Sequence, residues 1–167
     1  MSVFHPKKYF ENITQISPKW LEKQSIKGIL TDLDDTLVPY DVPLPTDELI
    51  NWFKTLHENG IKILIISNNG ESRVQAFCNC LNVKYIHKAG KPKKKAFLKG
   101  LELLDLPSEN VVFIGDQLFT DIYGANKMQI KSIAVKSLSS RSGLLVDIKR
   151  CIEKPIWRSF FKNSQNN

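Results

Sequence analysis

Short apolar runs alternate regularly with longer amphipathic segments between residues 27 and 135, and this alternation strongly constrains the fold. A short apolar run indicates a buried strand, whereas apolar side chains at helical spacing indicate a helix that packs on one face. The predicted strands span residues 29–33, 61–66, 83–86, 111–114 and 132–135. The predicted helices span residues 45–59, 72–81, 92–104 and 121–128. The alternation predicts an α/β fold of βαβ units, a Rossmann-like, doubly wound three-layer sandwich with a mostly parallel sheet.

The chain of 167 residues is long enough for one domain with a segment added at each end. We predict an N-terminal extension over residues 1–26, a main domain over 27–154 and an aromatic, basic tail over 155–167, with 163–167 disordered. Aromatic and cationic side chains mix in both end segments, which suits an anionic membrane surface. Apolar end segments also commonly dock on a core, so both interpretations stay open. Single-stranded RNA is a weaker alternative, because no nucleic-acid motif accompanies these side chains.

The net charge of +7 favours acidic partners, namely nucleic acid, anionic lipid or phosphorylated substrates. The cysteines and histidines show neither disulfide nor metal-ligand spacing, so we interpret them as structural side chains. They are Cys78, Cys80, Cys151, His5, His57 and His87. No apolar run approaches the ~18 residues needed to cross a bilayer, and no secretory signal is recognisable. We therefore expect a cytoplasmic protein. Peripheral binding at the inner face of the membrane is compatible with this expectation.

Polar side chains follow the predicted strands at the sheet edge where ligands of such folds bind. These side chains are Asp32, Asp34, Thr36, Ser67, Asn68, Asn69, Asp116 and Asp121, and Lys91 lies just before the helix predicted from residue 92. Each one alone is usually a turn or cap residue or part of a solvated face, but together they converge on one edge. Carboxylates gathered in one place repel one another unless a cation is present. Oxygen ligands without histidine or cysteine favour Mg²⁺ over zinc.

The same residues suggest a reaction. A phosphoryl group placed against Mg²⁺, Lys91 and the Ser67 hydroxyl has its oxygens neutralised from several sides, which favours in-line attack. A carboxylate can act as the nucleophile and give an aspartyl-phosphate that water later hydrolyses. Asp34 lies two residues after Asp32, so it can protonate the leaving group and then deprotonate water. The pattern therefore predicts a phosphomonoester hydrolase.

These motifs resemble those of the haloacid dehalogenase superfamily. The superfamily pattern is D-x-D-x-T, then a strand ending in Ser or Thr, then a lysine, then G-D-x-x-x-x-D. The matching residues are Asp32, Asp34, Thr36, Ser67, Lys91, Gly115, Asp116 and Asp121. The resemblance implies that Asp32 is the nucleophile and Asp34 the acid and base. It also implies that Asp32, the Asp34 backbone carbonyl and Asp116 bind the metal with support from Asp121, while Thr36, Asn68 and Asn69 contact the substrate.

The gaps between Thr36, Ser67 and Lys91 leave no room for the cap domain that many relatives carry. An uncapped site admits bulky or lipid-borne substrates. The chain is more specifically similar to the YqeG-type family of capless subclass IIIA, although Asp35 stands where we expect asparagine. That family is related to phosphatidylglycerophosphate phosphatases, which implies hydrolysis of phosphatidylglycerophosphate to phosphatidylglycerol.

Other functions remain open at this stage. A protein or nucleotide phosphatase would use the same mechanism. A receiver-like regulatory module would keep its phospho-aspartate and would lack an acid–base residue at the position of Asp34. A non-catalytic scaffold is disfavoured, because an idle site has no need for repelling carboxylates. Nucleic acid is not an expected partner, and no obligate protein partner is inferred.

Overall fold

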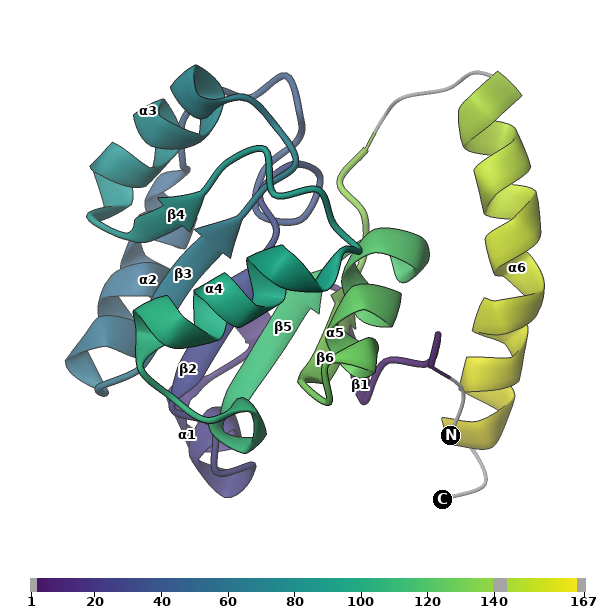
Figure 1. Cartoon of the computed structure of the whole chain (residues 1–167), viewed down its shortest axis with the longest axis horizontal. Coiled ribbons are helices and arrows are strands. Elements are labelled where there is room, and N and C mark those ends of the chain that lie inside the picture. The colour runs from purple at the N-terminus through teal and green to yellow at the C-terminus, as the bar shows by residue number, and fades with distance from the viewer. Residues whose placement is uncertain (1–2, 140–143, 165–167) are drawn as a thin grey trace.

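The computed structural model describes residues 3–139 and 144–164, and its centre is a six-stranded sheet in which every pair is parallel (Figure 1). The strands are β1 (Lys8–Phe10), β2 (Gly28–Thr31), β3 (Lys62–Ile66), β4 (Lys84–Ile86), β5 (Val111–Gly115) and β6 (Lys131–Val135). Their order across the sheet is β1-β6-β5-β2-β3-β4. The order changes direction at β2, so the carboxyl ends of β2 and β5 border the place where such folds bind ligands.

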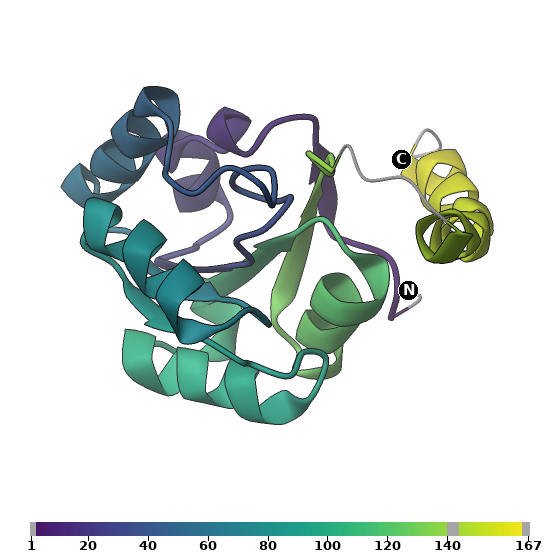
Figure 2. The same ribbon diagram turned by 90° about the horizontal axis from the view of Figure 1, so that it is seen from above.

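Helices cover both faces of the sheet (Figure 2). The helices are α1 (Pro18–Lys23), α2 (Asp47–Glu58), α3 (Glu71–Leu81), α4 (Lys94–Leu104), α5 (Tyr123–Lys127) and α6 (Leu144–Ser164). Shorter helical turns are η1 (Ile13–Gln15), η2 (Ser108–Asn110) and the π-helical η3 (Leu118–Ile122). Side chains of α1, α2 and α3 share one core cluster with Ile29, whereas α4 and α5 share another with Leu30. Adjacent strand residues point to opposite faces, so one apolar strand supports both layers.

The predicted α/β fold with a three-layer sandwich is confirmed, and the predicted strands and helices between residues 27 and 135 are present with slightly shifted ends. The helix predicted over residues 121–128 differs most. It begins as the π-helical η3 at Leu118 and continues as α5. Among the described residues, a flap over 37–44 and α2 fill the interval between β2 and β3, and α3 alone fills that between β3 and β4. Neither interval contains a cap domain.

The N-terminal segment adds elements that the apolar pattern does not predict. β1 is only three residues long and pairs with β6, with Lys8 opposite Ile133. Behind it, Ile13, Ile16 and Leu21 are buried in the core that contains α2. The indole N–H of Trp52 donates to the Ile16 carbonyl at 2.9 Å. In this structure, residues 8–23 therefore pack on the sheet and α2 as part of the same core.

The C-terminal segment is helical where we predicted a tail. α6 runs through the boundary drawn at residue 155 and includes Pro155, and the disorder predicted from residue 163 is wrong for 163 and 164. Residues 165–167 lie outside the described residues. The ring of Trp157 meets that of Tyr9 at 5.8 Å, and Trp157 packs beside Leu118 and Ile122. The ring contacts of Tyr9 with Trp157 and Phe161 hold α6 at the β1 side of the sheet, where Figure 2 shows it. No helix in the described part of the chain combines the length and apolarity needed to cross a membrane.

Candidate active site

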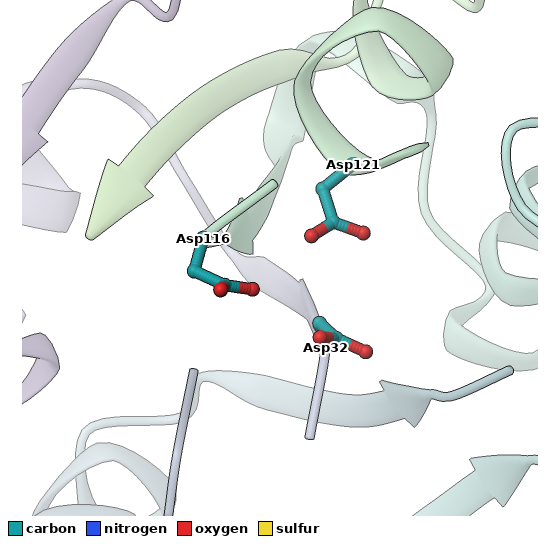
Figure 3. A group of neighbouring side chains, drawn as sticks. All are labelled: Asp32, Asp116 and Asp121. Atoms are coloured by element: carbon teal, nitrogen blue, oxygen red, sulfur yellow. The ribbon is translucent and has the colours of Figure 1, made fainter. Parts of the chain in front are cut away.

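Three carboxylates face one another beyond the carboxyl ends of the central strands (Figure 3). Asp32 follows β2 directly, and its backbone N–H donates to the Ile114 carbonyl at 2.9 Å. Asp116 follows β5, and Asp121 lies in η3. Each of the three offers an oxygen within 4.8 Å of the others. The sheet topology thus brings together carboxylates that lie far apart in the sequence.

Lys91 lies among these carboxylates. Its Nζ atom is 2.6 Å from Oδ1 of Asp32 and 2.8 Å from Oδ1 of Asp121. Burial raises the pKa of Asp32 to about 7; Lys91 opposes this rise, and Asp121 and Asp116 add to it. Burial alone would lower the pKa of Lys91, but the carboxylates of Asp121 and Asp32 raise it above its usual value. Lys91 therefore stays protonated and offsets part of the negative charge.

The donor set fits a divalent cation. Three carboxylates opposed by one ammonium leave a local excess of negative charge that such an ion can neutralise. The potential ligands are all oxygens, which suits a hard ion. Asp116 is held in place by the Thr36 hydroxyl at 3.1 Å and the Ser137 hydroxyl at 2.6 Å. Asp32, Asp116 and Asp121 therefore lie together at the predicted sheet edge, and their binding of a metal stays a prediction.

Thr36 and Asn68 contact protein groups here, although we expected both to bind substrate. The Thr36 hydroxyl lies 3.1 Å from Asp116 and 3.4 Å from Asp32, so it bridges the two carboxylates. Asn68 accepts from the backbone N–H of Lys91 at 2.8 Å and donates to the Lys91 carbonyl at 3.4 Å. These contacts orient the metal-site carboxylates and Lys91. Substrate contact by either residue stays a prediction.

Asp34 accepts hydrogen bonds at both of its carboxylate oxygens. Its Oδ2 accepts from the Asn69 amide at 2.8 Å and lies 3.5 Å from the Ser67 hydroxyl. Its Oδ1 accepts from Nε and Nη2 of Arg73 at 3.2 and 3.1 Å. The sequence interpretation missed Arg73. An arginine in the helix after the second motif is a weak signal by itself, because exposed helical arginines are common.

A cavity of about 210 Å³ is lined by six of the nine predicted site residues, but not by Thr36, Asp116 or Asp121. It is lined by Asp32, Asp34, Tyr40, Ser67, Asn68, Asn69, Lys91, Gln117 and Thr120. A liquid water occupies about 30 Å³, so a phosphoryl group and a few waters fit while a larger substrate body must extend outward. The sequence interpretation did not include Tyr40, Gln117, Thr120 or the Asp116 partner Ser137. Ser137 could have been found by applying the strand-end rule to β6.

The parallel sheet, with carboxylates and a lysine beyond its strand ends, is the arrangement of a class of phosphohydrolases. Comparison with known proteins supports this assignment. Residues 39–129 match the family model for haloacid dehalogenase-like hydrolases. The chain is 42% identical over 153 residues to "Probable phosphatase YqeG" of Bacillus subtilis (strain 168), covering 92% of this chain and 89% of that protein. The chain therefore belongs to the haloacid dehalogenase-like hydrolase family and is a phosphatase. The cluster of Asp32, Asp116 and Asp121 fits the divalent metal ion that phosphatases of this family use.

Solved structures share the fold at lower identity. An uncharacterized protein from Listeria monocytogenes serotype 4b aligns with a TM-score of 0.56 and 17% identity, over 71% of this chain and 85% of that one. An uncharacterized protein from Corynebacterium glutamicum aligns with a TM-score of 0.55 and 22% identity, over 65% of this chain and 84% of that one. The 3-deoxy-D-manno-octulosonate 8-phosphate phosphatase from Yersinia pestis aligns with a TM-score of 0.53 and 18% identity, over 68% of this chain and 66% of that one. At these identities the similarity concerns the fold alone.

Proposed function

We propose that this phosphatase hydrolyses phosphate monoesters with Mg²⁺ through an aspartyl-phosphate on Asp32. The observation that carries the proposal is the buried Lys91, which contacts both Asp32 and Asp121 beside the small polar cavity. Asp32, the backbone carbonyl of Asp34 and Asp116 would hold the metal. Bound there, the ion would neutralise negative charge on the phosphoryl oxygens and on the nearby carboxylates.

Each residue then has a role in two displacements. A carboxylate oxygen of Asp32 attacks phosphorus, and the bond from phosphorus to the ester oxygen breaks while that oxygen takes a proton from Asp34. Asp34 next takes a proton from water, which attacks the aspartyl-phosphate and releases inorganic phosphate and free Asp32. Lys91 and the Ser67 hydroxyl would bind the phosphoryl oxygens. Asp121 would hold Lys91 in place, and Asn69 would orient Asp34 at the cavity wall.

For the substrate we propose a lipid phosphate, phosphatidylglycerophosphate, with phosphatidylglycerol as product. Three features support it: an uncapped cavity that leaves the substrate body outside, the net charge of +7, and the exposed surface of α6. That surface has a hollow of about 570 Å³ lined by Lys154, Trp157, Arg158, Phe161 and Lys162. Cations beside aromatic rings suit an anionic bilayer, so we place the enzyme peripherally at the inner face of the membrane. A protein or nucleotide phosphatase is the alternative.

The test is phosphate release with Mg²⁺ from a mixed panel of substrates. The panel contains phosphatidylglycerophosphate in anionic vesicles, phosphopeptides, nucleotides and sugar phosphates. We expect the lipid to be cleaved most efficiently, and Asp32→Asn to remove at least about 10³-fold of the turnover, as loss of a nucleophile does. Efficient cleavage of soluble substrates with none of the lipid would reject the lipid assignment and leave the chemistry standing. Full turnover by Asp32→Asn would reject the mechanism itself.

A further inference from the structure

Arg73 contacts two separate parts of the active-site region with all of its side-chain nitrogens. Nε and Nη2 donate to Oδ1 of Asp34 at 3.2 and 3.1 Å. Nη1 donates to the Pro43 carbonyl at 2.8 Å. Asp34 lies just beyond β2 and Pro43 lies in the flap over residues 37–44, whereas Arg73 itself belongs to α3. One side chain therefore joins the predicted acid–base residue, the flap and a helix.

The local structure of α3 does not favour an arginine at this position. Arg73 lies in the first turn of a helix that begins at Glu71, and the positive end of the helix dipole repels a cation there by about 0.3–1 kcal/mol. Its guanidinium lies over the Phe77 ring, 5.8 Å from the centroid, which offsets part of this cost. The side chain is only 19% exposed, and that of Asp34 is 13% exposed. The Asp34 carboxylate is therefore the main attraction that holds the guanidinium inward.

Asp34 needs an external support because of where it lies. It lines the same cavity as Asp32, in the segment after β2 that belongs to no strand or helix. Lys91 is already paired with Asp32 and Asp121. On the other side, Asn69 holds Oδ2 at 2.8 Å, and Arg73 holds Oδ1. Arg73 is outside the set of residues that line the cavity, so it can act on the reaction through Asp34.

We propose that Arg73 is the positioning residue for proton transfer by Asp34, and that its bond to Pro43 keeps the flap in register with that carboxylate. This inference rests on the proposed function of Asp34 as acid and base. A misplaced Asp34 would be a poor base toward the water that hydrolyses the aspartyl-phosphate. Asp34 also protonates the leaving group, so loss of Arg73 should slow both displacements. With an ester whose leaving group departs without a proton, the second displacement should be slowed more, so that the phosphorylated enzyme accumulates during turnover.

The experiment compares wild type, Arg73→Met, Arg73→Lys, Asp34→Asn and Asp32→Asn with p-nitrophenyl phosphate, a soluble monoester whose leaving group departs readily without a proton. General acid–base catalysis contributes about 10²–10⁴-fold, so a badly positioned Asp34 should cost about 10- to 100-fold in kcat. Because a slower second displacement lets the phospho-enzyme accumulate, KM should fall together with kcat, while kcat/KM, which reports the first displacement, should change less. Samples of Arg73→Met quenched with acid during turnover should contain a larger fraction of phospho-enzyme than samples of wild type quenched in the same way. Arg73→Lys should be intermediate, because an ammonium cannot reproduce all of the contacts of the planar guanidinium.

Two controls make the outcome specific. Lys54→Met removes a cation from the exposed Lys54–Glu58 pair on α2, which should leave both kcat and the phospho-enzyme level unchanged. Arg73→Met added to Asp34→Asn should cause no further loss, because residues that act as one unit are not additive.

The possible results separate the two claims. Unchanged kcat in folded Arg73→Lys and Arg73→Met would overturn the positioning role while the hydrolase mechanism stands. A raised KM with unchanged kcat would also overturn it and would make Arg73 a substrate-binding residue. If Arg73→Met does not fold by circular dichroism, a wild-type kcat in Arg73→Lys decides against the proposal. Full turnover by both Asp34→Asn and Asp32→Asn would instead reject the proposed hydrolase mechanism, on which the positioning role of Arg73 rests.

Discussion

Asp32, Lys91 and Asp121 form a buried charged group in which each side chain is 8% exposed or less. Charges removed from water to this extent interact strongly, and removing one partner leaves the other uncompensated. Lys91 contacts both Asp32 and Asp121, and the hydroxyls of Thr36 and Ser137 contact Asp116. Removing the side chain of Asp32, Lys91 or Asp121 should therefore destabilise the site more than removing an exposed charge would.

Asp35 shows how a departure from the expected motif is accommodated. Its φ of 64° lies in the left-handed region, where asparagine and aspartate are the best tolerated residues after glycine. Its carboxylate accepts from the backbone N–H of Tyr40 at 3.0 Å, and its own N–H donates to Val38 at 2.7 Å. An asparagine would offer the same kind of side-chain oxygen. Aspartate therefore preserves the turn that starts the flap.

We predict a pH-dependent stability that Asp32 controls when no divalent metal is bound. The pKa of Asp32 is raised from 3.8 to about 7, mainly by burial, so the folded state binds an extra proton between these values. Stability due to this group is therefore fully present below the lower of these pKa values and lost as pH rises through the higher one. The measurement is urea unfolding in EDTA at several pH values for wild type and Asp32→Asn.

We expect the variant to gain stability relative to wild type as pH rises, and Mg²⁺ to stabilise wild type more at pH 8 than at pH 5. Parallel pH curves for the two proteins would contradict this account. Equal stabilisation of both by Mg²⁺ would show that Asp32 is not a ligand.

At the scale of elements, β5 and η3 are packed so closely that only glycine fits at the end of the strand. A Cβ atom on Gly115 would lie 2.5 Å from both Cβ and Oδ2 of Asp121. This explains why a glycine precedes Asp116: any side chain there would push Asp121 away from Lys91. The η3 turn also places Leu118 and Ile122 against Ala134, so the π-helical start of this segment is anchored in the core.

We predict that Gly115→Ala weakens metal binding about 10- to 100-fold, as loss of support behind a ligand typically does. The measurement is titration of the metal-free protein with Mg²⁺, followed by heat or by thermal stabilisation. Gly70→Ala is the matched control, because a Cβ atom added to Gly70 would have no neighbour within 4 Å and the φ of this residue is −69°. Equal metal affinity in Gly115→Ala and wild type would show that the close packing is not needed at the site.

On the scale of the whole molecule, the two ends of the chain meet at one edge of the sheet. Tyr9 of β1 contacts both Trp157 and Phe161 of α6, with ring centroids 5.8 and 5.5 Å apart. Figure 1 shows α6 beside this edge, on the side away from β4. The helix depends on a small aromatic cluster, whereas the sheet is held by two large cores. We therefore expect α6 to open without the rest of the fold.

We predict that Trp157→Ala lowers the free energy of opening α6 by about 1–2 kcal/mol, toward the low end of the value for full burial because Trp157 is only partly buried. Hydrogen exchange should speed up in residues 151–162 and stay unchanged in β2 and β5. Turnover of a soluble monoester should be retained, since no α6 residue lines the 210 Å³ cavity. Faster exchange across the central strands would instead mean that α6 and the sheet unfold together.

The alternation of apolar and amphipathic segments determined the α/β fold, and the strand-end rule determined the edge at which Asp32, Ser67 and Asp116 gather. These features are local or follow from general rules of parallel sheets, so a single sequence carries them. The contacts between Arg73 and Asp34, Ser137 and Asp116, and Tyr9 and Trp157 were decided only by the tertiary structure. Each joins residues far apart in sequence, and no periodicity records which distant side chain packing will bring within hydrogen-bonding or ring-contact distance.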